Sequence, residues 1–308
     1  MRKMKKNDWV FFFFLLIFLF SIVFTFKENV LAKGDFSFVP LTENSLFRPL
    51  LKEGASRSEF DSLSYLSVFV DKNNTRVFLE KNSQEKVFIA SLTKLMTAVI
   101  VLENYDLEDR VFISEKAIAT FGLAGEFQKG EVFPVKDLLY ILLVESSNDA
   151  AEAFAEKMGP EQFVSSMNRK AEELGMESTV FFNPSGLDFE VDKGNQSSVS
   201  DLEKLVIYIV DKHPLIAEML SVYEMDMYYE GGLHHYMRNT NVLLKEDSLY
   251  VWGKTGYTIK AKECIVLVMR PPFSKDENSY IINVIMGSEN RFKNARLMEQ
   301  WIKESFYW

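Results

Sequence analysis

The stretch Ala90-Ser91-Leu92-Thr93-Lys94-Leu95-Met96-Thr97-Ala98 is the segment around which the rest of the chain is organised. Its apolar residues, continued by Val99 and Ile100, recur at helical spacing, which predicts a helix with one face in a core. Ser91 opens this helix, and Lys94 lies one turn later on the same face. The helix N-terminus also favours negative charge developing on the serine. A hydroxyl beside an amine in this setting indicates a nucleophile and its base, and hence acyl transfer.

The composition of the 308-residue chain excludes some classes of function. The length allows one large domain or two modest ones, each with a real core. The formal net charge of −9 argues against a nucleic-acid partner, and no basic cluster lies beyond the first few residues. The sequence contains neither a phosphate-binding loop nor a cluster of metal-ligand residues. We therefore expect no cofactor and no metal.

The cysteine and histidines suggest no chemistry of their own. The single cysteine, Cys264, excludes an internal disulfide framework and lies in an apolar run, so a buried core thiol is expected. His213, His234 and His235 do not lie in a metal-ligand or triad-like pattern. We expect them to be solvated or packed against other side chains.

The N-terminus predicts export. Basic residues within the first six positions precede an uncharged run over residues 9–26, which ends at Lys27. Val30-Leu31-Ala32 offers a place for a signal peptidase to cut, but the apolar run is also just long enough to span a bilayer. A cleaved signal peptide and a retained anchor both stay open for residues 1–32. In either case we expect the rest of the chain outside the cytoplasm, with residues 33–60 as a tether and residues 61–308 as the functional domain.

The predicted elements fall into an opening hairpin, a helical block and a closing group of strands. Strand-like segments over 65–70 and 75–80 flank a turn over 71–74 and lead directly to the Ser91 helix. The helical block begins with a buried helix over 136–144 and a second helix that starts at Asp149. An amphipathic helix over 161–174 follows and stops at Gly175, and residues 183–186 form a turn. The last helix of the block has a capping box of Ser200 and Glu203 and runs to about Asp211.

The last third of the chain is strand-rich. It contains strand-like segments over 250–255, 264–269 and 280–286 and a closing helix over about 294–306. An all-helical insertion between two parts of one antiparallel sheet accounts for this order. The expected fold class is therefore α/β, in the sense of α+β, with an antiparallel sheet packed against helices.

Short motifs that carry chemistry occur in a fixed order: Ser91-x-x-Lys94, then Ser146-x-Asn148, then Lys254-Thr255-Gly256. The first pattern also occurs at Ser83, and the second at Ser166 and Ser288, whereas Lys-Thr-Gly occurs once. Context separates these candidates, because Ser83 lies in a polar turn, Ser166 inside an amphipathic helix and Ser288 just after a strand. Only the ordered set lies where elements begin, break or line a cleft.

With these motifs the chain resembles the D-alanyl-D-alanine carboxypeptidase family of low-molecular-weight penicillin-binding proteins. The resemblance runs from about Leu63 to Trp301 and implies a fold like that of serine DD-peptidases and β-lactamases. The segments that carry it are Phe88–Ala98, Asp137–Ala151, Met167-Asn168, Leu174–Met176, Asn183–Asp188, Asn239–Asn241 and Gly253–Thr258.

The resemblance implies roles for the catalytic residues. Ser91 would attack the carbonyl of a D-Ala-D-Ala bond and become acylated, after Lys94 has taken its proton. Burial and the charge of Lys254 would lower the pKa of Lys94, as a base requires. Ser146 would relay a proton to the leaving amine.

The same resemblance implies a substrate-binding set. Asn148 would orient Lys94 and bind the substrate amide, Lys254 would supply positive charge, and Thr255 would bind the terminal carboxylate. Gly256 would leave room for the substrate backbone.

An oxyanion hole and a second cation complete the implied site. The backbone N–H groups of Ser91 and Tyr257 would stabilise the oxyanion. Arg291 resembles the carboxylate-binding arginine of the family by its spacing to Trp301. The chain departs from the family where Ala261 is followed by Lys262 instead of glycine, which affects the expected geometry of the local hairpin.

The implied activity is removal of the terminal D-Ala from peptidoglycan stem pentapeptides, with β-lactams as covalent inhibitors and with membrane contact through an uncleaved N-terminal segment. Two alternatives stay open: a DD-endopeptidase that cuts cross-links, and a penicillin-binding sensor or wall-binding module without turnover. The endopeptidase is favoured somewhat, because the chain ends at Trp308, where the catalytic domain of the family ends. A Glu-x-x-Leu-Asn segment, which a β-lactamase that deacylates through glutamate would need, is missing from the sequence.

Overall fold

The computed structural model describes residues 49–55, 60–72, 74–122, 124–188, 193–246, 248–273 and 278–308. The N-terminal export segment expected from the sequence lies outside these residues. Among the described residues, no helix has the length and apolar character needed to cross a membrane. Residues Pro49–Trp308 form one unit by their contacts.

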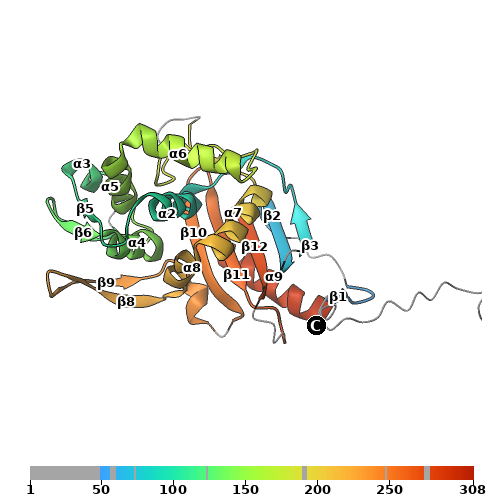
Figure 1. Ribbon diagram of the computed structural model, residues 1–308. Coiled ribbons are helices and arrows are strands. Elements are labelled where there is room, and N and C mark those ends of the chain that lie inside the picture. Colours follow the sequence, from blue (N-terminus) through green and yellow to red (C-terminus); the bar gives the residue numbers. More distant parts are fainter. Residues whose placement is uncertain are drawn as a thin grey trace, which may run out of the picture. The chain divides into compact units, whose positions relative to one another are not determined.

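Strands from the two ends of this unit form one five-stranded antiparallel sheet (Figure 1). Its order is β10-β11-β12-β2-β3, so that β12 pairs with β2, with Ile281 opposite Phe69. The strands are β2 (Ser64–Asp71), β3 (Asn74–Lys81), β10 (Tyr250–Thr258), β11 (Lys262–Met269) and β12 (Ser279–Ser288). The predicted division of the sheet by a helical insertion is thus confirmed.

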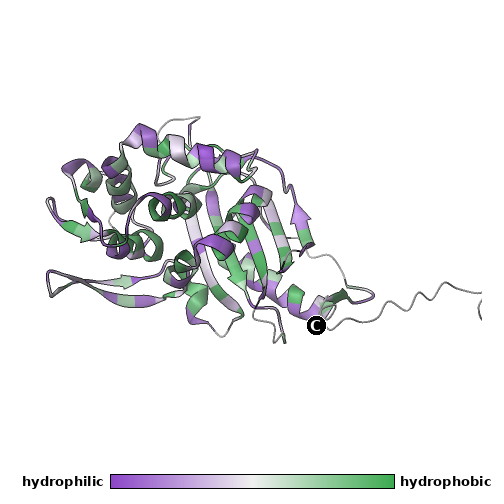
Figure 2. Cartoon of the chain, viewed as in Figure 1, coloured by the Kyte–Doolittle hydropathy of each residue, from purple (hydrophilic) through white to green (hydrophobic). Residues whose placement is uncertain are grey.

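Both faces of β2, β10, β11 and β12 are largely buried, whereas the edge strand β3 is mostly exposed. The burial explains the long apolar runs of the inner strands, which Figure 2 shows in green. On one face Val68, Val266 and Val284 join the core shared with the helical insertion. On the other face Phe69 and Ile265 pack in a second cluster with α9 (Arg291–Ser305). Neighbouring residues alternate between the two faces because a strand has a period of two.

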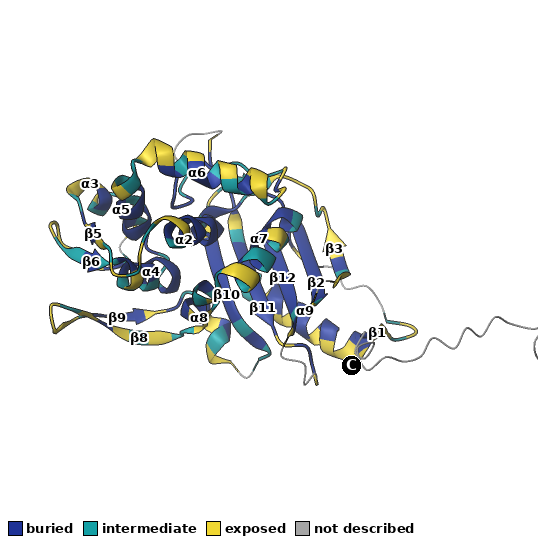
Figure 3. Cartoon of the chain, in the orientation of Figure 1, coloured by how far each residue is buried: buried dark blue, intermediate teal, exposed yellow. Residues whose placement is uncertain are grey.

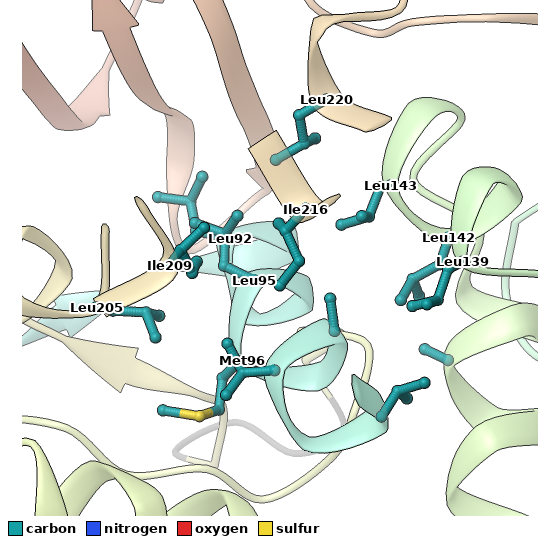
Figure 4. Packing of buried hydrophobic residues seen from close by; sticks show 14 of the residues in the cluster. Leu92, Leu95, Met96, Leu139, Leu142, Leu143, Leu205, Ile209, Ile216 and Leu220 are labelled. Atoms are coloured by element: carbon teal, nitrogen blue, oxygen red, sulfur yellow. The ribbon is translucent and has the colours of Figure 1, made fainter. Parts of the chain in front are cut away.

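The helices of the insertion pack around α2 (Thr93–Asn104), which follows the 3₁₀ turn η1 (Ala90–Leu92). Figure 4 shows Leu92, Leu95 and Met96 surrounded by leucines and isoleucines of α4, α7 and α8. Every residue of α2 from its start to Val101 is buried, so this helix lies inside the protein. The other helices are α3 (Glu115–Ile118), α4 (Val135–Val144), α5 (Asn148–Met158), α6 (Pro160–Glu173), α7 (Val199–Lys212) and α8 (Pro214–Ser221).

Short paired strands, which the sequence analysis does not predict, complete the fold. The hairpin of β8 (Glu224–Tyr229) and β9 (Gly232–Arg238) is the longest of them. The other pairs are β1 (Leu50–Leu51) with β13 (Phe306–Tyr307), β4 (Val87–Phe88) with β7 (Gln196–Ser197), and β5 (Arg110–Phe112) with β6 (Val132–Pro134). The 3₁₀ turn η2 (Val242–Lys245) precedes β10. Two-residue strands carry too little periodicity to be found in a sequence.

Element boundaries differ from the expected ones in a few places. The N-cap of α7 is Ser198, whose side chain accepts from the N–H of Asp201, so the predicted capping box at Ser200 is wrong. Strand β1 lies within the stretch assigned to the tether, and the unit begins at Pro49. The hairpin after Lys-Thr-Gly closes with Thr258 paired to Lys262, which has a φ of +54°, in the left-handed region that favours glycine.

Candidate active site

Ser91 is the middle residue of η1 and is partly buried, while α2, which follows, is buried along most of its length (Figure 3). The preceding residue, Ala90, has a φ of +47°, a conformation that costs a non-glycine residue energy and persists only where the surroundings impose it. The Oγ atom of Ser91 lies 2.9 Å from Nζ of Lys94. The predicted nucleophile and base are therefore within hydrogen-bonding distance.

Lys94 is fully buried and has polar partners from separate segments. Besides Ser91, its Nζ atom contacts Oδ1 of Asn148 at 2.6 Å and the carbonyl oxygen of Ser185 at 2.6 Å. Nδ2 of Asn148 in turn donates to the carbonyl oxygen of Phe121 at 2.6 Å, which holds the Asn148 side chain in place. The sequence predicts the Asn148 contact but not that of Ser185.

The surroundings of Lys94 favour its neutral amine. Burial, and then the charge of Lys254, hold the pKa of Lys94 well below its ordinary value of 10.5, while Asp149 acts in the opposite direction. Burial likewise raises the pKa of Asp149 to about 7, against the effect of Lys94. The lowered pKa increases the fraction of neutral amine, the form that can accept the proton of Ser91.

Ser146 and Lys254 meet on the other side of the site. Nζ of Lys254 donates to Oγ of Ser146 at 2.7 Å and to the carbonyl oxygen of Thr255 at 3.0 Å. Ser146 has a φ of +64° in the turn between α4 and α5. Burial, and then the nearby guanidinium of Arg291, lower the pKa of Lys254 to about 7.

Strand β10 approaches the nucleophile segment closely at Gly256. A Cβ atom on this glycine would lie 2.9 Å from the carbonyl oxygen of Ile89 and 3.1 Å from the backbone nitrogen of Ser91. The missing side chain thus makes room for the protein's own backbone, in addition to any substrate. Arg291 donates from Nη1 to the carbonyl oxygen of Gly256 at 2.8 Å.

The remaining residues of the predicted set line the end of β10. Oγ1 of Thr255 is 2.6 Å from Oγ1 of Thr240. Tyr257 is largely exposed and borders a groove of about 980 Å³, whose other walls include Phe121, Leu187 and Ile259. The groove thus borders the end of β10 that carries Tyr257.

The cysteine and the histidines lie elsewhere. Cys264 is buried opposite Gly256 in the sheet, and burial raises the pKa of its thiol to about 11. Each histidine pairs with a glutamate: His213 with Glu103, His234 with Glu131, and His235 with Glu145. No cluster able to hold a metal occurs within the described ranges.

Comparison with known proteins places this geometry in a family. Residues 52–290 match the family of peptidases S11, described as D-alanyl-D-alanine carboxypeptidase. The chain belongs to this family. Its DD-peptidase signature and the five-stranded sheet with a helical insertion agree with the resemblance inferred from the sequence.

Similar proteins carry two activities in their names. DacF of Bacillus subtilis, a D-alanyl-D-alanine carboxypeptidase, is 31% identical over 80% of this chain and 63% of its own length. A D-alanyl-D-alanine endopeptidase of Pseudomonas aeruginosa is 30% identical over 83% of this chain and 79% of its own length. The structure of penicillin-binding protein D2 from Listeria monocytogenes in its ampicillin-bound form has a TM-score of 0.66 and 25% identity, covering 80% of this chain and 99% of that one. This chain thus spans under two thirds of the carboxypeptidase DacF.

Proposed function

We propose that this DD-peptidase is a carboxypeptidase that removes the terminal D-Ala of peptidoglycan stem pentapeptides through an acyl-enzyme on Ser91. The observation that carries the proposal is the buried amine of Lys94, lying 2.9 Å from the Ser91 hydroxyl with its pKa lowered by burial. Nucleophile and base within hydrogen-bonding reach are the signature of covalent acyl transfer.

Acylation follows from this pair. The Ser91 hydroxyl gives its proton to the lone pair of Lys94 while Oγ forms a bond to the carbonyl carbon of the scissile amide. The carbonyl oxygen becomes an oxyanion, which the N–H groups of Ser91 and Tyr257 stabilise. Collapse breaks the C–N bond and expels D-Ala as an amine, which receives through Ser146 the proton that Lys94 took from Ser91. Ser146 is contacted by Lys254 at 2.7 Å. Water then cleaves the ester and restores Ser91.

Binding of the terminal carboxylate selects the end of a peptide. Lys254 and Arg291 provide positive potential on this side of the site, and the hydroxyl of Thr255 provides a donor. Asn148 orients Lys94 and offers its amide to the substrate. A site of this kind suits a carboxypeptidase, because the free carboxylate exists only after the last residue.

Export completes the proposal. Residues 1–32 carry a basic start and a long apolar run, and peptidoglycan lies outside the cytoplasmic membrane. We assign this segment to a signal peptide or anchor, with contact to the membrane if it is retained. β-lactams, as acylating analogues, are the expected covalent inhibitors at Ser91.

A second activity, DD-endopeptidase cleavage of cross-links, is supported by the relative of that name from Pseudomonas aeruginosa, which matches at 30% identity over 79% of its length. The two activities use the same acylation chemistry. They differ in whether the leaving amine is free D-Ala or belongs to a second stem peptide.

Mass spectrometry of muropeptides distinguishes these activities. The chain lacking residues 1–32 is incubated with pentapeptide monomers and cross-linked dimers, and Ser91→Ala serves as the control. We expect loss of one D-Ala from the monomers with the wild-type protein alone. Conversion of dimers to monomers would establish an endopeptidase instead, and acylation by penicillin without any product would establish a sensor or wall-binding module.

A further inference from the structure

The turn Asn183-Pro184-Ser185-Gly186 lies directly against the start of α2. Nζ of Lys94 donates to the carbonyl oxygen of Ser185 at 2.6 Å. A Cβ atom on Gly186, which has a φ of +89°, would lie 2.0 Å from the carbonyl oxygen of Ala90. The turn therefore packs against the nucleophile segment without space for a side chain, and it brings a backbone acceptor to the base.

Asn195 ties this turn to α2. Its Oδ1 atom accepts from the backbone nitrogens of Phe182 at 2.7 Å and Asn183 at 3.3 Å. Its Nδ2 atom donates to the carbonyl oxygen of Asn183 at 2.8 Å and to Oγ1 of Thr93 at 2.9 Å. The side chain is buried and uses both ends of its amide, so it fixes the turn relative to the residue before Lys94.

The partners of Lys94 determine where its lone pair points. A neutral amine has two N–H bonds and one lone pair. The Ser185 carbonyl can only accept, and so can Oδ1 of Asn148, because the carbonyl oxygen of Phe121 fixes the orientation of that amide. Both N–H bonds are thereby used, and the lone pair faces the third partner, the hydroxyl of Ser91.

We propose that Asn195 is a positioning residue for the base. It holds the Ser185 carbonyl against Lys94, and this contact keeps the lone pair aimed at the Ser91 proton. When the proton moves from Ser91 to Lys94, the new ammonium has three N–H bonds for the same three partners, so no rearrangement is needed. This role rests on the acylation chemistry proposed above and adds Asn195, Thr93 and the Ser185 carbonyl to it.

Steady-state kinetics on diacetyl-L-Lys-D-Ala-D-Ala test the proposal with Asn195→Ala in the full chain. We expect kcat to fall about tenfold to a hundredfold, with KM within about twofold of the wild-type value, because misorientation of a reacting group affects the chemical step. The loss of kcat should persist between about pH 7 and about pH 9.5, because raising the pH increases the fraction of neutral Lys94 but does not orient its lone pair. The rate of acylation by a fluorescent penicillin should fall by the same factor.

Asn168→Ala is the matched control. Asn168 also bridges backbone groups in this region, donating to the carbonyl oxygens of Val164 and Phe181 and accepting from the nitrogen of Phe181. It contacts neither the turn nor α2 through these bonds. We expect its kcat, per folded molecule, to stay within about twofold of the wild-type value even if its melting temperature falls as much as that of Asn195→Ala.

Thr93→Val supplies a second variant, because it keeps the volume of the side chain and removes only the acceptor of Asn195 Nδ2. It should show a smaller loss of kcat with unchanged KM. Equal losses for the Asn195 and Asn168 variants, a loss confined to KM, or full recovery at high pH would each overturn the positioning role. Failure of the wild-type protein to be acylated at all would instead overturn the proposed function.

Discussion

At the scale of the residue, Lys254 combines two properties that normally oppose each other. It is fully buried, and in the proposed function its positive charge binds the terminal carboxylate of the substrate. Burial and Arg291 lower its pKa to about 7, so the cation is present below this pH and is lost above it. In the proposed role of Lys254, carboxylate binding requires the cation and should become weaker as the pH rises through about 7.

This titration predicts a pH-dependent KM. For diacetyl-L-Lys-D-Ala-D-Ala, KM should rise as the pH increases from about 6 to about 9, by up to about tenfold per unit of pH above the pKa. The inhibition constant of the corresponding C-terminal amide, which lacks the carboxylate, should not follow this titration. Parallel pH profiles for the acid and the amide would contradict the assignment of Lys254 to carboxylate binding.

Gly256 offers a second prediction at this scale. In Gly256→Ala the new Cβ atom meets the carbonyl oxygen of Ile89 and the nitrogen of Ser91, so β10 or the nucleophile segment must move. We expect acylation by fluorescent penicillin to fall about a hundredfold, as displacement of a catalytic group by about 1 Å can cause.

Gly232→Ala is the matched strand control for this variant. The nearest atom to a Cβ at Gly232, the carbonyl oxygen of Tyr229, lies at 3.8 Å, so this variant should be acylated at the wild-type rate. Equal acylation of both variants would show that the close approach of β10 is unimportant.

At the scale of the element, α7 shows how a side chain outside a helix decides where it begins. The sequence predicts an N-cap at Ser200, but the structure uses Ser198, which is buried and accepts from the nitrogen of Asp201 at 3.1 Å. The Ser200 capping box is locally reasonable. The structure does not use this box, because the pairing of β7 with β4 already sets the path of the chain up to Ser197.

The two serines give a matched pair of variants. Ser198→Ala should lower the free energy of unfolding by about 1 kcal/mol, because it removes the acceptor of an N-terminal N–H group. Ser200→Ala should change it by less than about 0.5 kcal/mol. Denaturant unfolding measures both, and a larger effect for the Ser200 variant would contradict the assigned cap.

At the scale of the whole molecule, one buried apolar cluster joins the sheet and the helical insertion. Val68 and Val266 of the sheet belong to the same cluster as Leu142 and Phe154 of the insertion. A shared core of this kind predicts that Pro49–Trp308 unfolds as one cooperative unit.

Phe154→Ala tests this cooperativity. Removal of this fully buried ring should lower the free energy of unfolding by about 3–5 kcal/mol. The tryptophans of the unit, Trp252, Trp301 and Trp308, lie outside the insertion and report on the sheet and its last helix, while circular dichroism weights the helices. The unfolding midpoints from tryptophan fluorescence and from circular dichroism should shift together. A shift of the midpoint from circular dichroism alone would show that the insertion unfolds separately.

Local patterns in the sequence determined much of this protein. The helical period around Ser91 placed the Ser91–Lys94 pair on one face, and alternating or continuous apolar runs placed β2, β10, β11 and β12. The Lys-Thr-Gly and Ser-x-Asn motifs indicated which residues to expect beside the serine. These features depend on spacings of a few residues, which a sequence displays directly.

Only the tertiary structure decided how distant groups meet. The contact of Lys254 with Ser146 joins residues 108 positions apart, and that of Lys94 with the Ser185 carbonyl joins residues 91 apart. Main-chain carbonyls carry no residue identity, so no pattern could mark Ser185 as a partner of the base. Local periodicity determines which face of an element is buried, whereas packing determines which atoms face each other across the site.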